Sequence, residues 1–159
     1  MEEFYIDKTL HCGRPDDCSK RSEKEIACYD MLDELGMEYF RIDHDVANTI
    51  KDCEAVEKYL GGSIYKNLFL CNRQKTNFYL LIMQGEKPFK TKDFSKRIGS
   101  SRLSFAGPED LEKYLNLTPG SVTILGLMND KENNVQLAFD RPVIEGEFFC
   151  CHPDRKSVV

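Results

Sequence analysis

Residues 65–83, YKNLFLCNRQKTNFYLLIM, contain two apolar runs on either side of a polar turn. The runs 66–71 and 78–83 are rich in leucine and phenylalanine, and each has the length of one strand. The stretch 72–77 between them is polar, as a connection between paired strands would be. We therefore predict a β-hairpin here.

Capping signals predict short helices along the rest of the chain. Ser22 with Glu25 and Thr49 with Asp52 each form a capping-box signature, in which side chains satisfy the unpaired amides of a first helical turn. Glycines follow both segments and supply left-handed stops. The predicted helices lie over residues 23–35, between Thr49 and Gly61, over 93–98 and over 108–115.

Short apolar runs predict further strands over residues 38–44, 102–106, 122–127, 135–139 and 148–151. The runs 122–127 and 135–139 flank a turn rich in Asn, Asp and Lys, which predicts a second hairpin. Hairpins with interspersed short helices indicate an α+β fold with a mixed, largely antiparallel sheet packed by short helices. We expect an irregular N-terminal arm over residues 1–21 and one domain over 22–159.

Composition limits the possible classes of protein. The 159 residues are 41% hydrophobic, enough for one core, and the net charge of −5 argues against a protein that coats nucleic acid by bulk charge. No apolar run approaches the roughly 18–20 residues of a membrane span, and the N-terminus lacks a signal-peptide pattern. We therefore expect a soluble, cytoplasmic protein with no membrane partner.

The seven cysteines form no CxxC pair and are odd in number, so they indicate reduced thiols rather than a disulfide framework or a zinc ribbon. His11-Cys12 with Cys18, and Cys150-Cys151-His152, are the nearest approach to a metal cluster, and their spacing is not that of a standard ligand pair. Signatures of nucleophile-elbow hydrolases, zincins, P-loop enzymes and dinucleotide enzymes are absent. We predict no metal and no cofactor.

Three features at predicted strand ends could carry chemistry. Lys66 stands at the mouth of an apolar run, where its ammonium must reach water or find an acceptor. The turn around Gly120 can present backbone N–H groups to an anion or a polarised carbonyl. His152 ends a predicted strand and can act as an acid, a base or a ligand. Each also has a structural interpretation, as a solvated lysine, an ordinary turn and a core histidine.

Four sequence blocks occur in a familiar order: residues 65–70 (YKNLFL), 101–106 (SRLSFA), 119–130 (PGSVTILGLMND) and 151–153 (CHP). Together they resemble the free-standing aminoacyl-tRNA deacylases of the ProX type, which are related to the editing domain of bacterial prolyl-tRNA synthetase. The resemblance covers about residues 22–153, nearly the whole chain.

The resemblance implies hydrolysis of the ester that joins a wrongly attached amino acid to the acceptor end of tRNA(Pro). It assigns catalytic roles to Lys66, Gly120 and His152. The expected substrate contacts are Asn67, Phe69, Ser121, Val122, Thr123 and His44. Two positions depart from the family pattern: Ile124 stands in place of a proline, and Lys156 in place of an asparagine.

The implied deacylase activity does not require a strong nucleophile or a metal, because an aminoacyl ester is already activated and needs only to be held, polarised and supplied with water. We expect a cleft between Lys66, Gly120 and His152, and favour alanine over cysteine as the amino acid removed. A local basic strip could contact tRNA in spite of the acidic net charge. Its candidates are Lys87, Lys90, Lys92, Lys96, Arg97 and Arg102, which a solvated helix face would explain equally well.

The alternative is a non-catalytic binding module that senses an amino acid or a charged tRNA in the same pocket. The departures at Ile124 and Lys156 keep this alternative open. The sequence leaves the oligomeric state undecided, and we favour a monomer.

Overall fold

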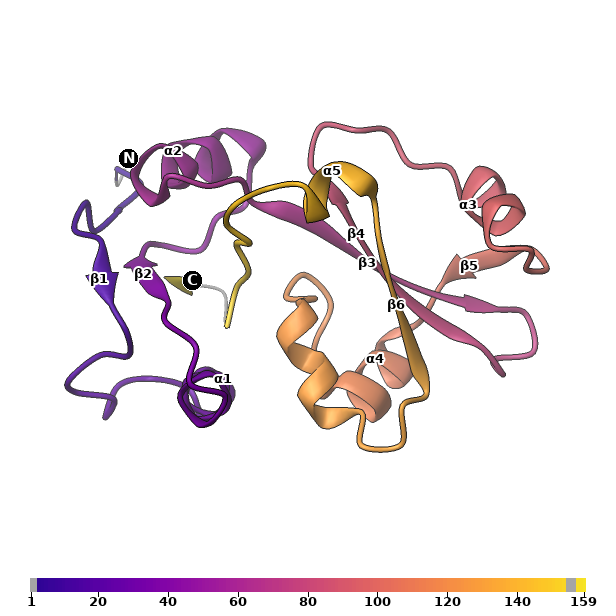
Figure 1. Ribbon diagram of the computed structural model, residues 1–159, viewed down its shortest axis with the longest axis horizontal. Helices are drawn as coiled ribbons and strands as arrows, with labels where there is room; N and C mark the ends of the chain where they lie inside the picture. The colour runs from indigo at the N-terminus through magenta and orange to yellow at the C-terminus, as the bar shows by residue number, and fades with distance from the viewer. Residues whose placement is uncertain (1–2, 154–156) are drawn as a thin grey trace. The chain divides into compact units, whose positions relative to one another are not determined.

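The computed structural model describes residues 3–153 and 157–159, and the chain divides into two compact units (Figure 1). We call them the terminal unit, Met1–Ile64 with Phe148–Val159, and the central unit, Tyr65–Glu147. Each unit has its own β-sheet together with helices, so the predicted α+β class is confirmed.

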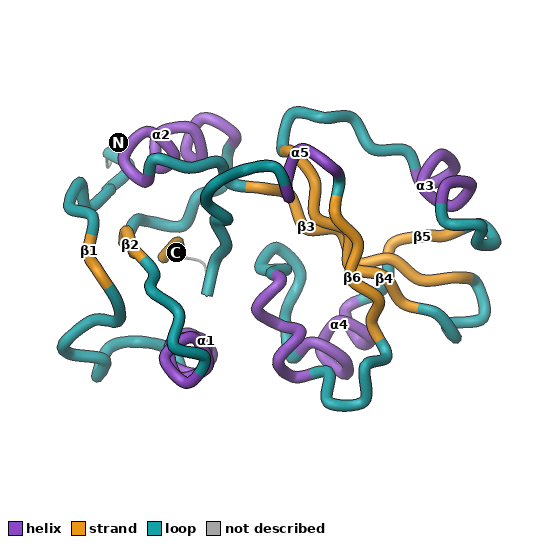
Figure 2. The backbone as a smooth tube through the Cα atoms, in the orientation of Figure 1, coloured by secondary structure: helices purple, strands orange, loops and turns teal. Residues whose placement is uncertain are grey.

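The central unit is built on a four-stranded sheet in the order β5-β3-β4-β6 (Figure 2). Its strands are β3 (Tyr65–Asn72), β4 (Phe78–Gln84), β5 (Leu103–Phe105) and β6 (Val135–Phe139). β3 pairs antiparallel with both β4 and β5, whereas β6 pairs parallel with β4. The hairpin predicted from the two apolar runs is confirmed, as is the mixed, largely antiparallel sheet.

Short helices connect these strands: α3 (Thr91–Arg97), α4 (Pro108–Leu115), the 3₁₀ helix η1 (Ile124–Asn129) and α5 (Arg141–Ile144). α3 and α4 confirm the helices predicted over 93–98 and 108–115. Pro108 lies at the first position of α4, where its missing N–H has no intrahelical partner to lose. α5 was not predicted.

Side chains along β3 alternate between two faces of the central sheet. Phe69 and Cys71 belong to a core that includes Leu111 and Leu115 of α4, and we call this side the α4 face. Leu68 and Leu70 belong to a second core that includes Phe94 of α3, and we call that side the α3 face. The sheet is therefore covered on both sides, which explains why its central strands read as continuous apolar runs.

The second hairpin, predicted over 122–127 and 135–139, is wrong. The first run forms η1, whose start is capped by the Thr123 side chain, and β6 pairs with β4 instead. Gly126 packs so closely against Leu117 that a Cβ atom would lie 2.6 Å from it, which fixes η1 against the end of α4. The Asp130 carboxylate then accepts the amide of Val135 at 2.7 Å and directs the chain into β6.

The terminal unit contains a small antiparallel sheet in the order β1-β2-β7. Its elements are β1 (His11–Cys12), α1 (Glu23–Glu34), β2 (Phe40–Asp43), α2 (Ile50–Leu60) and β7 (Ser157–Val158). The helix starts at Ser22 and Thr49 are confirmed, because each side chain accepts the backbone N–H three residues on. Gly61 ends α2 with a φ of 78°, the left-handed conformation expected of a glycine stop.

Two predictions for this unit need correction. The arm over residues 1–21 is not wholly irregular, because His11–Cys12 pairs with β2 as β1. The strand expected over 148–151 is reduced to one isolated bridge between Ile64 and Cys150, and the last strand of the chain is β7. Both differences arise from pairing between distant segments, for which the local sequence carries no signal. The boundary between an arm and a domain at residue 22 stays a prediction.

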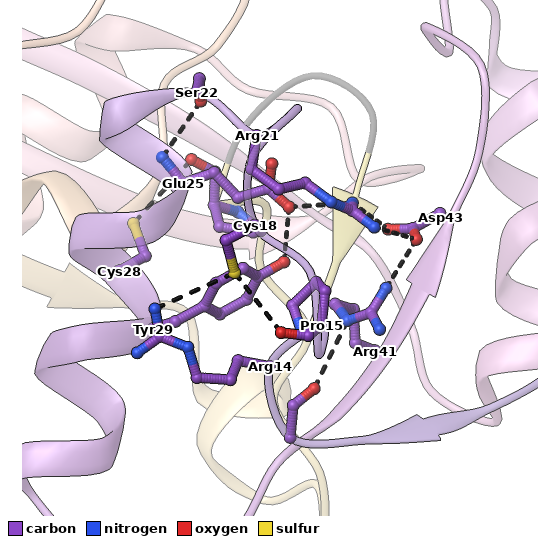
Figure 3. A network of polar contacts seen from close by, with 12 residues as sticks. Arg14, Pro15, Cys18, Arg21, Ser22, Glu25, Cys28, Tyr29, Arg41 and Asp43 are labelled. Atoms are coloured by element: carbon purple, nitrogen blue, oxygen red, sulfur yellow. Dashed lines mark hydrogen bonds and ion pairs between the residues drawn. The ribbon is translucent and has the colours of Figure 1, made fainter.

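A buried polar network holds the terminal unit together (Figure 3). Arg21 and Arg41 converge on the Asp43 carboxylate, with N···O distances of 2.8 and 2.6 Å. Glu25 is 1% exposed and accepts a hydrogen bond from the Tyr29 hydroxyl at 2.6 Å. Burial alone would raise the pKa of Asp43, but the hydrogen bonds from the two arginines outweigh it and hold that pKa below its ordinary value of 3.8.

Among the residues that the structure describes, no helix is long and apolar enough to cross a membrane.

We predict that Gly126→Ser lowers the free energy of unfolding by about 1–3 kcal/mol, because the new Cβ would overlap the side chain of Leu117. The matched control is Gly107→Ser. Position 107 is the N-cap of α4, has open space around it and suits a serine. Urea denaturation checks both variants. Equal midpoints for Gly126→Ser and the wild type would contradict the packing described here.

We also predict that Asp43 makes the terminal unit sensitive to acid. Its pKa is lower folded than unfolded, so its contribution to stability is complete above about pH 4 and is lost as the pH falls through the folded pKa. The urea midpoint should therefore fall less between pH 6 and pH 3 in Asp43→Asn than in the wild type. The exposed Asp16→Asn serves as the control. Parallel pH curves for wild type and Asp43→Asn would contradict the prediction.

Candidate functional site

Lys66 lies at the beginning of β3 and projects toward the α3 face. Its partner across the ladder is Met83. Its side chain lies on the same face of the sheet as those of Leu68 and Leu70, because residues two apart in a strand point to the same side. Its ammonium donates a hydrogen bond to the backbone carbonyl of Lys87, in the connection that leads from β4 to α3. The ammonium is thus held by a neutral acceptor and keeps its charge available for an anion.

Asn67 points to the opposite, α4 face, where its partner across the ladder is Ile82. Its side-chain amide donates to the carbonyl of Tyr65 at 3.2 Å. Its Oδ1 atom is buried and has no hydrogen-bond partner in the described part of the chain. A buried acceptor without a donor costs about 1–3 kcal/mol, so this atom is a strong candidate for contact with a ligand.

Phe69 shares the α4 face with Asn67 but lies in the core. Its ring is 4% exposed and stacks on Phe78, with centroids 5.7 Å apart. Any contact of Phe69 with substrate would therefore involve only a small part of the ring. That role stays a prediction.

The turn around Gly120 offers some backbone donors and uses others. Gly120 has a φ of 86°, and the Ser121 amide closes the turn on the Thr118 carbonyl at 3.1 Å. The Ser121 hydroxyl bonds to the same residue, so neither group of Ser121 points freely outward. The amides of Val122 and Thr123, by contrast, donate to no acceptor among the residues that the structure describes.

Ile124 begins η1 and packs its side chain against the α4-face core. Where the family pattern has a proline, this isoleucine adds a backbone N–H, which also finds no acceptor in the described part of the chain. The departure from the family pattern therefore adds a donor beside those of Val122 and Thr123. The other departure, Lys156, lies outside the described residues.

His44 and His152 lie together in the terminal unit. Their rings meet edge to face, with centroids 5.7 Å apart and an interplanar angle of 87°. Nδ1 of His44 lies 2.6 Å from the Asp45 carbonyl and must carry the proton, because a carbonyl only accepts. Its Nε2 is buried without a hydrogen-bond partner in the described structure.

The structure thus sorts the predicted site residues into three groups. Asn67, Phe69 and the Gly120 turn belong to the α4 face of the central unit, and Lys66 to its α3 face. The two histidines belong to the terminal unit. The cleft expected between Lys66, Gly120 and His152 draws on both units and stays a prediction. The strand alternation at 66 and 67 could have separated these two neighbours from the sequence alone.

In the part of the chain that the structure describes, the cysteines belong to no metal-binding cluster, and the two at positions 150 and 151 are not activated thiols. No group of three His, Cys, Asp or Glu side chains in the described residues could hold a metal ion. Burial raises the pKa of Cys150 to about 11 and that of Cys151 to about 12. Both thiols are therefore protonated at neutral pH and are poor nucleophiles.

Comparison with known proteins identifies the family. Residues 44–158 match the family of aminoacyl-tRNA editing domains. The chain belongs to this family. It therefore has the predicted enzyme class of an aminoacyl-tRNA deacylase, which hydrolyses the ester between an amino acid and tRNA.

Two relatives cover most of the chain. The prolyl-tRNA editing protein ProX of Acetoanaerobium sticklandii is 35% identical over 126 residues, which are 79% of this chain and 77% of that protein. The prolyl-tRNA synthetase associated domain-containing protein 1 of Danio rerio is 29% identical over 80% of this chain and 70% of its own length. The resemblance described from the four sequence blocks is confirmed.

Solved structures support the fold. A candidate trans-editing enzyme for prolyl-tRNA synthetase matches with a TM-score of 0.63 at 12% identity, over 86% of this chain and 85% of that one. The protein APE2540 matches with the same TM-score at 16% identity, over 84% and 85% of the two chains.

We predict that Cys150 and Cys151 resist alkylation by iodoacetamide at pH 8 in the folded protein, because both are buried and protonated. The exposed Cys12 is the internal control and should react fastest. Mass spectrometry of the labelled protein, with and without urea, reports each site. Rapid labelling of Cys151 in the native protein would contradict its burial.

Proposed function

We propose that this protein hydrolyses alanyl-tRNA(Pro) in trans, as a quality-control step of translation in the cytoplasm. The observation that carries the proposal is that the central unit leaves both kinds of group unused: the Oδ1 acceptor of Asn67 and, among the described residues, the amide donors of Val122 and Thr123. An aminoacyl ester needs both kinds of partner. Its α-ammonium requires an acceptor, and its carbonyl oxygen becomes negative during hydrolysis and requires donors.

The reaction that we propose needs no protein nucleophile. Water adds to the ester carbonyl carbon, and the backbone amides of Val122 and Thr123 stabilise the oxyanion that forms. The bond between the carbonyl carbon and the ribose oxygen then breaks, the ribose oxygen takes up the proton that the added water gives up, and the free amino acid leaves. Such donors act because they are already fixed by the turn and by the start of η1, so no reorganisation is needed when charge develops.

Lys66 fits the role of a phosphate anchor rather than that of a base. Its ammonium already occupies a position where it bonds a neutral carbonyl, which an anionic phosphate oxygen of the terminal adenosine would replace favourably. His152 is proposed to lie near the amino group of the substrate. His44 is proposed to orient the His152 ring through the edge-to-face contact between the two rings. Ser121 contributes by closing the turn on Thr118.

The choice of tRNA(Pro) rests on the relatives, two of which are named for prolyl-tRNA editing or for an association with prolyl-tRNA synthetase. Alanine and cysteine differ by one sulfur atom in size, so the pocket selects between them by volume. A difference of this size changes the free energy of binding by only about 1–3 kcal/mol, and we propose alanine as the amino acid removed. We propose that the enzyme acts as a monomer on the acceptor end of the tRNA.

The central test compares Lys66→Ala, Asn67→Ala and the exposed control Lys131→Ala in single-turnover hydrolysis of alanyl-tRNA(Pro), with thermal melts alongside. Lys66→Ala should lose on the order of 100-fold in rate, because the ester is no longer held in register with its donors. Lys66→Arg should recover only part of this loss, since a planar guanidinium does not reproduce a compact ammonium.

Asn67→Ala should also lose activity while melting at or above the wild-type temperature, because it removes a buried acceptor that has no partner. A purely structural Asn67 would show the reverse, a lower melting temperature with an unchanged rate. Dialysis of the wild type against a chelator should leave the rate unchanged.

The substrates to compare are alanyl-, cysteinyl- and prolyl-tRNA(Pro). Turnover of the first alone confirms the assignment. Tight binding of alanyl-tRNA(Pro) without release of alanine would overturn it and would instead establish the non-catalytic binding module.

A further inference from the structure

A short stretch of the central unit carries a charge opposite to that of the whole protein. Residues 87–102 contain six basic residues and one acidic residue, a net charge of +5 in a chain whose net charge is −5. An ordinary solvated surface carries both signs of charge, so solubility alone does not explain this excess of positive charge. A local positive field of this kind attracts polyanions even when the protein as a whole is acidic.

Most of these cations are not used within the protein. Lys87 forms an ion pair with Asp140 at 2.7 Å. The other five are exposed and form no ion pair with any residue that the structure describes: Lys90, Lys92, Lys96, Arg97 and Arg102. The arginines of the terminal unit differ from these residues, because Arg14, Arg21 and Arg41 all form ion pairs with carboxylates.

Hydrogen bonds connect α3, which carries three of these cations, to the strand β5. The buried Ser95 hydroxyl donates to the Thr91 carbonyl at 2.6 Å and accepts the amide of Leu103 at 3.0 Å. These bonds tie α3 to β5, which lie side by side in the central unit (Figure 1). The cations of α3 and the residues of β5 therefore keep a fixed relation to one another.

An exposed aromatic ring follows these cations in the chain, three residues after Arg102. Phe105 is 59% exposed, although its ladder partner Leu70 is completely buried on the α3 face. Its ring meets Phe89 edge to face, with centroids 6.0 Å apart, which limits its movement. Aromatic rings next to unpaired cations are the combination with which proteins bind single-stranded nucleic acid, because every base can stack on such a ring.

The same face carries the ammonium of Lys66. That ammonium bonds the carbonyl of Lys87, the first residue of the basic stretch, so the strip begins where the proposed phosphate anchor lies. Both belong to the central unit, and Phe89 and Phe94 of this stretch pack on the α3 face of the sheet. Along the chain, the unpaired cations thus extend from the connection after β4 through α3 to the residue before β5, and we call them the basic track.

We propose that this track, Lys90, Lys92, Lys96, Arg97 and Arg102 with Phe105, is the surface that binds the acceptor arm of the tRNA. The cations contact backbone phosphates, and Phe105 stacks on an unpaired base near the 3′ end. The proposal rests on the proposed function, since it assigns a docking surface to the RNA part of that substrate. A structural alternative is that the charges only shield the exposed edge strand β5 from aggregation.

The test uses the triple variant Lys92→Ala/Lys96→Ala/Arg97→Ala and a control triple of equal charge, Lys24→Ala/Lys51→Ala/Lys131→Ala, whose three lysines are exposed and lie outside the track. Binding of uncharged tRNA(Pro) is measured by fluorescence anisotropy over a range of KCl concentrations. The track variant should bind at least about 30-fold more weakly at low salt, and its slope of log K against log salt should be shallower by about 2–3, roughly 0.9 for each lost phosphate contact.

Phe105→Ala should weaken binding by about 10-fold without changing the salt slope, because stacking releases no counterions. If the control triple weakens binding as much as the track variant, the effect is one of bulk charge and the proposal fails. It also fails if the track variant binds tRNA normally, which would leave edge protection as the role of these charges.

A small ester without an RNA body separates this proposal from the proposed function. The track variant should hydrolyse 3′-O-alanyladenosine at the wild-type rate, since none of its three residues contacts the reacting atoms. Loss of that activity in the track variant would place these residues in the active site and overturn the docking role. If the wild type hydrolyses neither alanyl-tRNA(Pro) nor 3′-O-alanyladenosine, the proposed function is refuted. The anisotropy measurement with tRNA would still show whether the basic track binds RNA.

Discussion

The pairing of β3 with β4 decides what each functional side chain can reach. The ladder runs without a bulge from Tyr65 opposite Gln84 to Cys71 opposite Phe78, so the alternation of side chains is strict. Lys66 and Asn67 are therefore neighbours in sequence that serve opposite faces of one sheet. A shift of the register by one residue would exchange them and bury the lysine among the α4-face residues. The cores on the two faces oppose such a shift, because it would turn every apolar side chain to the wrong side.

This constraint divides the work of binding between two faces. On the α4 face, unused backbone donors lie near the start of η1, and an unused acceptor lies on β3. On the α3 face, the ammonium of Lys66 bonds only a neutral carbonyl, and an anionic phosphate oxygen could replace that carbonyl. In the function that we propose, the ester and the nucleic acid therefore meet different chemistry on either side of one strand. An enzyme for an activated ester needs little else, because its task is to position and polarise rather than to attack.

The sequence predicted those parts of the structure that depend on local signals. Ser22 and Thr49 mark helix starts because a capping side chain acts within three residues of itself, and the hairpin follows from two apolar runs around a polar turn. The strand over 122–127 failed for the opposite reason. Its apolar composition suits a strand or a buried helical turn, and the choice is made by the contact of Gly126 with Leu117. The parallel pairing of β6 with β4 likewise depends on the whole intervening chain.

The residue types of the candidate site could be predicted from the sequence, but the hydrogen-bond partners of those residues could not. Nothing in the sequence shows that the Ser121 amide is consumed inside its own turn while that of Thr123 is not. The partner of the Lys66 ammonium is a backbone carbonyl, which every residue possesses and no motif reveals. The value of an unpaired buried atom such as Asn67 Oδ1 lies in this difference. Folding tolerates its cost only because the rest of the core supplies enough stability, and that cost is recovered when a ligand donates to it. The bonds that a protein leaves unmade at buried atoms therefore carry information about a binding site that its residue types alone do not.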